Sequence, residues 1–224
     1  MIEERQEQET TSEKETGRLE AFSDGVFAVA ITILVFDLKV PPAATTSAQL
    51  LGLLGHAWAS YLLLFISFAT ILIMWISHHS MFKLIHRSDT LFMFANGFLL
   101  LLVTIVPFAN SLVANYLETG AAVTACAFYA GLFLVINITY ILLWWSAVSH
   151  HLLKANVSRI LVKTRTRTYL LGLPGYLLAL LCAFWNPFVS VGICSVLWLF
   201  WAVASYEREP LLFVHTQATK GTTQ

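Results

Sequence analysis

The chain has 224 residues, with 13 basic and 13 acidic side chains, so its formal net charge at pH 7 is zero. Hydrophobic residues make up 58% of the sequence and charged residues 12%, about half the charged share of a soluble domain. This composition excludes an ordinary soluble domain and favours an integral membrane protein. The balanced charge gives no indication of a nucleic-acid partner.

Residues 1–16 are acidic and contain no apolar run, so we expect a disordered tail there, neither a signal peptide nor a span. Long segments without Asp, Glu, Lys or Arg follow, and a spanning helix needs about 20 mostly apolar residues. In the last of these segments, Asn186-Pro187 is a turn signal that predicts two helices joined by a tight hairpin. We therefore predict an all-α membrane domain over 17–208 and a C-terminal tail over 209–224. The six predicted spans are roughly 18–39, 55–77, 90–110, 121–146, 168–185 and 188–206.

The basic residues predict the orientation of these spans. Arg18, the pair Lys83 and Arg87, the run over 154–167, and Arg208 all fall on one side, whereas the loops of the other side carry only Lys39. By the positive-inside rule, both termini are expected in the cytoplasm. The 154–167 run is first an orientation anchor, and its charge also suits anionic lipid head groups.

The first span joins a polar cluster directly to an apolar helix. The cluster consists of Arg18, Glu20, Ser23 and Asp24, and the helix carries a hydroxyl, Thr32, near its centre. An ionisable group at the mouth of a span is costly, so the cluster is a candidate functional site. The alternative is that Arg18 and Asp24 only mark where the membrane begins.

Helical periodicity places one narrow stripe of residues along this span. At about 100° per residue, the stripe contains Arg18, Phe22, Gly25, Val29, Thr32 and Phe36. Asp24 lies about 110° away and faces a neighbouring helix instead. The stripe is suited to lining a narrow, mostly hydrophobic passage. A lipid-facing or core face, with Thr32 bonded to its own backbone, is the competing interpretation.

The sequence Arg18, three residues, then Phe22-Ser23-Asp24-Gly25 resembles the signature of the endolysosomal potassium channel family (transmembrane protein 175 family), in its bacterial single-repeat branch. The likeness is close over residues 18–39. Trp75, His78 and His79, at the end of the second span, extend it along the chain.

The resemblance implies a potassium-permeable channel in which a homotetramer surrounds a central pore lined by the first helices. The family uses a hydrophobic constriction, and this sequence indeed has no TVGYG-like loop that could form a carbonyl filter. By the family spacing, Val29 is the constriction, Thr32 supplies the hydroxyl above it, and Phe36 forms the next apolar ring. A single helix cannot enclose a pore, whereas four copies of it related by cyclic symmetry form a closed ring. This geometry is a physical argument for the tetramer. A bacterial inner membrane is the implied location, with K⁺ as the permeant ion and no cofactor.

The family pattern further implies a structural network at the foot of the first helix. Arg18 is expected to pair with Asp24, and Trp75 and His79 to hydrogen-bond towards Ser23 and Asp24. Phe22 and Asn96 complete this expected network. His78 and His79 are adjacent and point about 100° apart, so we predict no metal site.

Two other classes of function compete with a channel. A proton- or cation-coupled secondary transporter usually has a carboxylate or broken helices near the midplane and inverted repeats. In the first span, Asp24 and Asp37 lie near opposite ends and not at the midplane. An intramembrane enzyme requires a nucleophile–base pair or metal ligands at depth. The sequence has no HExxH or GxSxG motif, so we predict that the chain is not an enzyme.

Overall fold

The computed structural model describes residues 2–38 and 44–206, whose regular elements are all helical. These elements are α1 (Ile2–Ile33), the 3₁₀ turn η1 (Leu34–Asp37), α2 (Ser47–His56), α3 (Trp58–Phe82), α4 (Thr90–Tyr116), α5 (Ala122–Ser149), α6 (Arg159–Ala183) and α7 (Pro187–Tyr206). Within the described residues, six helices are long and apolar enough to cross a membrane, namely α1 and α3 to α7. The predicted all-α fold with six spans is confirmed.

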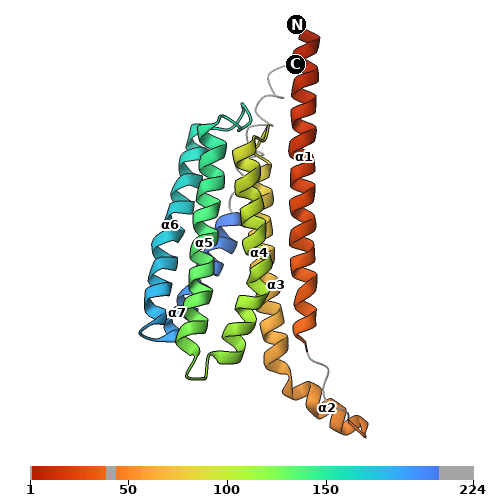
Figure 1. Ribbon diagram of the computed structural model, residues 1–224, viewed down its shortest axis with the longest axis vertical. Coiled ribbons are helices and arrows are strands. Elements are labelled where there is room, and N and C mark those ends of the chain that lie inside the picture. Colours follow the sequence, from red (N-terminus) through yellow and green to blue (C-terminus); the bar gives the residue numbers. More distant parts are fainter. Residues whose placement is uncertain (1, 39–43, 207–224) are drawn as a thin grey trace, which may run out of the picture.

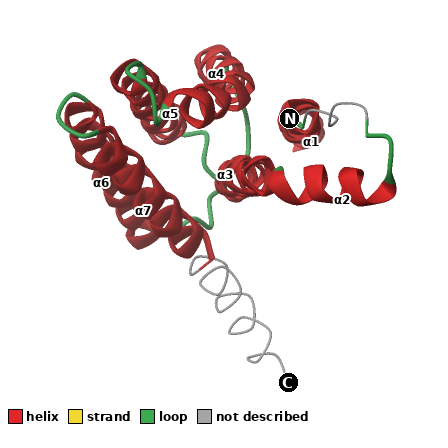
Figure 2. Ribbon diagram, turned by 90° about the horizontal axis from the view of Figure 1, so that it is seen from below, coloured by secondary structure: helices red, strands yellow, loops and turns green. Residues whose placement is uncertain are grey.

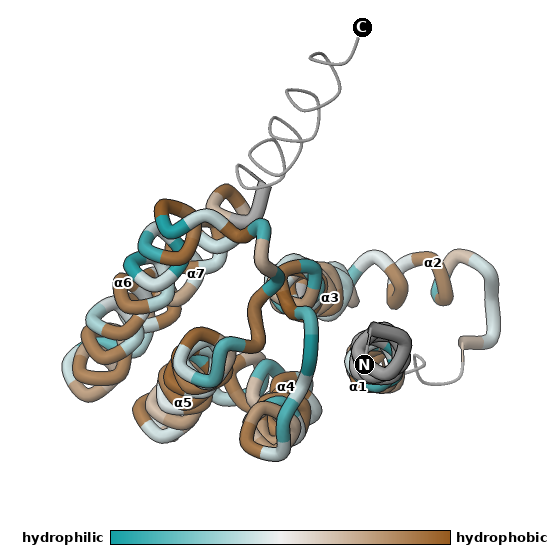
Figure 3. Tube along the Cα trace, turned by 90° about the horizontal axis from the view of Figure 1, so that it is seen from above, coloured by the Kyte–Doolittle hydropathy of each residue, from teal (hydrophilic) through white to brown (hydrophobic). Residues whose placement is uncertain are grey.

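The six long helices run side by side, and α2 turns away from the end of α3 (Figure 1). Helix α5 packs against α4, α6 and α7 and contributes many of the buried side chains, including Cys126, Ala130 and Leu143. Helix α1 stands at the edge of the group, where it contacts α3 and α4 (Figure 2). Seen from above, apolar residues recur around all six long helices, as expected of segments that lie in lipid (Figure 3).

Local signals in the sequence fix several helix ends. Asp89 caps α4 by accepting a hydrogen bond from the Phe92 backbone N–H at 2.8 Å, and Ser158 caps α6 in the same way. Asn186 Oδ1 accepts from the Phe188 N–H at 3.0 Å, and Pro187 occupies the first position of α7, where its missing N–H costs nothing. The hairpin predicted at Asn186-Pro187 therefore lies between α6 and α7.

The loop between α3 and α4 is joined to the loop between α5 and α6. His86 N–H donates to the Leu152 carbonyl at 2.8 Å, and Lys154 N–H donates to the Leu84 carbonyl at 2.9 Å. Beside this short bridge, His150 Nδ1 forms an ion pair with Asp89. Burial works to raise the pKa of the Asp89 carboxyl, but its hydrogen bonds to His150 and to backbone N–H groups lower that pKa below its ordinary value.

The N-terminal segment differs from our expectation. Residues 2–16, predicted to be disordered, continue α1 back to Ile2, and this part of the helix extends beyond the ends of the other spans (Figure 1). Glu, Gln and Lys are good helix formers, and the apolar span that follows removes the cost of nucleating a new helix. The tail predicted over 209–224 lies outside the described residues.

Two span boundaries also differ. The second span was expected to begin near Gly55, but Gly55 lies in the separate helix α2 and the span begins with α3. Thr46 caps α2 by accepting from the Gln49 N–H. The fifth span was expected at 168, but α6 begins at Arg159, because three exposed basic side chains of its first turns can reach the water at the membrane surface.

Candidate functional site

The stripe predicted on the first span is exposed along its whole length in the chain. Phe22, Gly25, Val29, Thr32 and Phe36 all lie on the outer face of α1 and η1, with Val29 55% and Phe36 81% exposed. The Thr32 hydroxyl donates to the Val29 carbonyl at 2.9 Å. Because the helix tightens into the 3₁₀ turn η1 after Ile33, Phe36 is rotated from its ideal α-helical direction but stays exposed.

The opposite face of α1 is buried against its own bundle. Ser23, Phe27, Ala30 and Leu34 are all at most 2% exposed, so this face faces α3 and α4 along three turns. Ala30 has a small side chain, which allows a close helix contact. The direction of the outer stripe is therefore fixed by packing on the inner side.

A buried chain of hydrogen bonds joins α1, α4 and α3 at the foot of the first helix. Asn96 of α4 donates its amide to Ser23 Oγ at 2.9 Å, and its carbonyl oxygen bonds His78 Nε2 of α3 at 2.8 Å. Ser23 in turn donates to the Leu19 carbonyl. Asn96, Ser23 and His78 are fully buried, so each bond replaces an interaction with water that burial has removed.

Two further contacts join α1 to α3 beside this chain. Trp75 Nε1 donates to Asp24 Oδ1 at 2.8 Å, and His79 Nδ1 lies 2.9 Å from Glu20 Oε1. The rings of Trp75 and His79 stack with their centroids 5.4 Å apart. Trp75 thus contacts both the carboxylate of α1 and the imidazole one turn away on its own helix.

Arg18 and Asp24, which we expected to pair, do not pair in the structure. Asp24 is bonded to Trp75, and Arg18 is exposed on a different side of α1, because six residues of helix turn the two side chains about 120° apart. Phe22, also expected in the network, is 63% exposed. Arg18 and Phe22 line an open gap of about 600 Å³ between α1 and α4. The other residues of its lining are Glu15, Leu19, Ser88, Met93, Asn96 and Gly97.

Two members of the network, Glu20 and His78, were not predicted from the sequence. Glu20 takes the place expected for Ser23 or Asp24 as the partner of His79, and His78 reaches Ser23 through Asn96. The signal for Glu20 was its position one turn before Asp24, which puts both carboxylates on one face of the helix. No signal in the chain alone pointed to the contact between His78 and Asn96, because it depends on how α3 packs against α4.

Arg165 differs from the other residues of the basic run over 154–167, which we predicted to be an orientation anchor. It lies within α6, is only 1% exposed, and donates from Nη2 to Ser80 Oγ of α3 at 3.1 Å. Its neighbours in the run, Lys154, Lys163 and Arg167, are exposed. The run therefore contributes both a buried contact between α6 and α3 and an exposed basic face.

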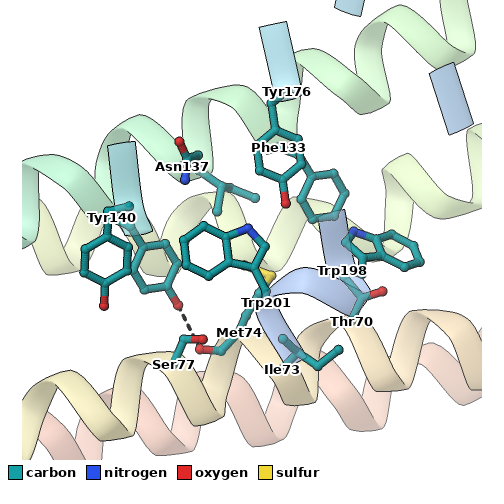
Figure 4. A pocket seen from close by; sticks show the side chains of 12 residues that line it. Thr70, Ile73, Met74, Ser77, Phe133, Asn137, Tyr140, Tyr176, Trp198 and Trp201 are labelled. Atoms are coloured by element: carbon teal, nitrogen blue, oxygen red, sulfur yellow. Dashed lines mark hydrogen bonds between the residues drawn. The ribbon is translucent and has the colours of Figure 1, made fainter. Parts of the chain in front are cut away.

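A separate cavity of about 40 Å³ lies inside the bundle among α3, α5, α6 and α7 (Figure 4). Half of its lining residues are aromatic, and the lining comprises Phe133, Tyr140, Tyr169, Tyr176, Trp198 and Trp201, with Thr70, Ile73, Met74, Ser77, Ile136 and Asn137. Among the described residues, Asn137 Oδ1, Tyr169 OH and Trp198 Nε1 find no hydrogen-bond partner. The space suits about two or three water molecules, which could satisfy these groups.

These features define the class of the protein. It is an integral membrane protein with six helical spans, in which a buried polar network fixes the first helix and leaves a continuous face of that helix exposed. Comparison with known proteins gives the family. Residues 18–107 match the family model described as endosomal/lysosomal potassium channel TMEM175. The chain belongs to the TMEM175 family, a family of ion channels and not of enzymes.

Relatives match nearly the whole chain. A potassium channel of Chamaesiphon minutus is 44% identical over 199 residues, which cover 88% of this chain and 98% of that protein. A potassium channel of Streptomyces collinus is 36% identical over 189 residues, which cover 84% and 91% of the two chains. The crystal structure of a lysosomal potassium-selective channel TMEM175 homolog from Chamaesiphon minutus superimposes with a TM-score of 0.71 at 42% identity, covering 86% of this chain and 98% of that one.

Proposed function

We propose that this chain is the subunit of a homotetrameric, potassium-permeable channel, in which four copies of α1 surround a central pore with a hydrophobic constriction. The relatives from Chamaesiphon minutus and Streptomyces collinus, which match most of the chain, are both named potassium channels. K⁺ is the permeant ion in this proposal, and conduction requires no cofactor.

The observation that carries the proposal is the two-sided character of α1. Its inner face is buried against α3 and α4, while Gly25, Val29, Thr32 and Phe36 on its outer face touch no other part of the described chain closely enough to be buried. A pore needs such a face from several subunits, because one helix cannot enclose a passage. Fourfold cyclic symmetry supplies a closed ring from a single sequence.

Within that ring, Val29 forms the constriction and Thr32 a polar layer above it. Four Val29 side chains around an axis make an apolar neck that excludes water until it widens or becomes more polar. The Thr32 hydroxyl donates its proton to the Val29 carbonyl, so the lone pairs of its oxygen remain available to a cation. Four such oxygens replace part of the hydration shell of K⁺. Phe36 adds a second apolar ring near the outer end.

The proposed location is a bacterial inner membrane with both termini in the cytoplasm. Basic residues concentrate at the end of the bundle that contains the foot network, as the positive-inside rule requires of the cytoplasmic side. Lys154, Lys163 and Arg167 are exposed there and are placed to contact anionic lipid head groups.

A vesicle flux assay on two matched variants tests the pore. Val29→Asn puts an amide into the constriction and should raise basal K⁺ flux in proteoliposomes. Ile31 points about 160° away from Val29 and packs against the core, so Ile31→Asn should not raise the flux and should mainly lower the yield of folded protein. Equal flux through both variants would refute the pore assignment. Thr32→Ala should keep the flux but weaken any preference for K⁺ over Na⁺.

The same vesicles separate a channel from the competing coupled transporter. A channel passes K⁺ down its gradient without moving protons in a fixed ratio, whereas a transporter shows saturating, proton-coupled uptake. Native mass spectrometry in mild detergent tests the assembly. A tetramer supports the proposal, and a monomer or dimer that persists across several detergents contradicts it.

A further inference from the structure

The foot of α1 brings three metal-ligating side chains together that are far apart in the sequence. Glu20 and Asp24 lie one turn apart on α1, His79 faces them from α3, and one ligand atom from each lies within 4.8 Å of the others. All three are only partly buried, so an ion can reach them from the cytoplasmic side. We propose that these residues bind one divalent transition-metal ion of the Zn²⁺ type in each subunit, bridging α1 to α3.

The distances suit such an ion once the side chains adjust. Zn²⁺ binds imidazole nitrogen and carboxylate oxygen at about 2.0–2.2 Å in tetrahedral geometry, so its ligand atoms lie about 3.3–3.6 Å apart. Glu20 Oε1 and His79 Nδ1 are already 2.9 Å apart. The three ligand atoms lie within 4.8 Å of one another, so the widest separation must close by at most about 1.5 Å, which rotation of the Glu20 and Asp24 side chains can supply. Water completes the coordination.

Trp75 holds two of the three ligands in place. Its Nε1 donates to Asp24 Oδ1 at 2.8 Å and leaves the second carboxylate oxygen for the ion, while its ring stacks on His79. Metal-ligating carboxylates are commonly oriented by such a hydrogen bond from outside the coordination sphere. The indole therefore limits the freedom that Asp24 and His79 would lose on binding.

The donor set selects the kind of ion. One imidazole nitrogen with two carboxylates favours Zn²⁺, Co²⁺ or Ni²⁺ over Mg²⁺, which prefers oxygen ligands and keeps its water. It also discriminates against the monovalent permeant ion, because two adjacent carboxylates are best neutralised by a double charge. All three ligands come from one chain, so the site does not depend on the proposed tetramer or on conduction.

Occupancy would clamp the foot of α1 to α3. The ion replaces one ion pair with three coordination bonds, and an ion that binds only the folded chain raises its stability by mass action. Zn²⁺ should therefore raise the thermal midpoint of the purified protein. This readout does not require ion conduction.

Binding to the full-length protein in detergent, stripped of metal with a chelator, tests the site. Isothermal titration with Zn²⁺ should give one ion per chain, and Glu20→Gln and His79→Gln should each weaken binding about tenfold or more, since each removes a ligand. Both variants should elute as the wild type does. Glu20→Gln is the safer variant, because the partly exposed Glu20 side chain bonds a single side chain of the described residues, that of His79.

The control is His150→Gln, which removes the other histidine–carboxylate pair of the cytoplasmic end, with Asp89. It should leave Zn²⁺ affinity unchanged. The proposal is overturned if Glu20→Gln binds as tightly as the wild type, if His150→Gln abolishes binding, or if the wild type shows no saturable binding below about 1 mM. Co²⁺ gives a second readout, since its visible absorption should appear in the wild type and not in Glu20→Gln.

Discussion

Asn96 is the residue whose replacement should reveal most about how α1 is held. Its amide bonds both Ser23 of α1 and His78 of α3, and it is fully buried. Asn96→Leu keeps the approximate shape of the side chain and removes both hydrogen bonds. The change therefore isolates the polar contribution from the cost of a cavity.

The magnitude follows from the two lost bonds. Interhelical hydrogen bonds in a membrane contribute about 0.6 kcal/mol on average and at most about 1.7 kcal/mol, because the unfolded chain in lipid also finds partners. Two bonds give about 1–3 kcal/mol. The loss should lie in the upper half of this range, because His78 is left with its Nε2 unpaired in the core and its Nδ1 already lacks a partner among the described residues.

The assay is thermal unfolding of the purified protein in detergent, followed by fluorescence-detected size exclusion. Asn115→Leu is the matched control, because Asn115 also lies in α4 but is exposed and bonds only the Ser111 carbonyl of its own helix at 2.7 Å. Asn96→Leu should lower the midpoint by several degrees and Asn115→Leu by little. If the two variants have the same thermal midpoint, the buried hydrogen bonds of Asn96 do not hold α1 in place, and the reasoning is wrong.

Two more predictions concern packing and pH. A Cβ at Gly172 would lie 2.6 Å from Asn137 Nδ2, so Gly172→Ala should destabilise the protein by about 1–3 kcal/mol through overpacking. Gly131→Ala, whose Cβ would meet its nearest neighbour at 4.0 Å, should be neutral or stabilising in the same melt. The lowered pKa of Asp89 means that its contribution to stability is complete above about pH 4 and is lost as the pH falls through the lower folded-state value. Asp89→Asn keeps the helix cap but should flatten this acid part of the stability profile, and an unchanged profile would count against the pair with His150.

The spans could be predicted from sequence because lipid allows few solutions. A charge-free segment of sufficient length must satisfy its backbone within a helix, so hydropathy alone located all six spans. The exposed stripe of α1 was predicted from helical periodicity, because a span in lipid must be a helix with about 100° between successive residues. The assembly of the subunits determines whether this exposed stripe faces a pore or the lipid.

What the sequence did not predict depends on contacts between helices. The start of α6 was missed because Arg165 was counted as a charge outside the membrane, whereas Ser80 of a distant helix receives it in the interior. Arg18 was expected to pair with Asp24 because the family pattern implies that pair, but the two side chains point about 120° apart on α1. The hydrogen bond from Trp75 to Asp24, which the same pattern implies, is present. The neutral partner Ser80 leaves no charge pattern in the sequence from which its contact with Arg165 could be predicted.

The anchoring of α1 at one end gives the helix the mechanics of a lever. Trp75 and Asn96 bond α1 at Asp24 and Ser23, and the buried residues of α1 and η1 that follow in the described chain, Phe27, Ala30 and Leu34, are apolar. Val29 is about 7.5 Å along the axis from this fulcrum and Phe36 roughly 19 Å, using the rise of the α and 3₁₀ turns. A rigid tilt of about 5° would therefore move Val29 by about 0.7 Å but Phe36 by about 1.7 Å. In the proposed pore, helix tilt would therefore displace the outer ring of Phe36 more than twice as far as the ring of Val29, so we expect wetting at Val29 to depend more on the polarity of that ring than on helix tilt.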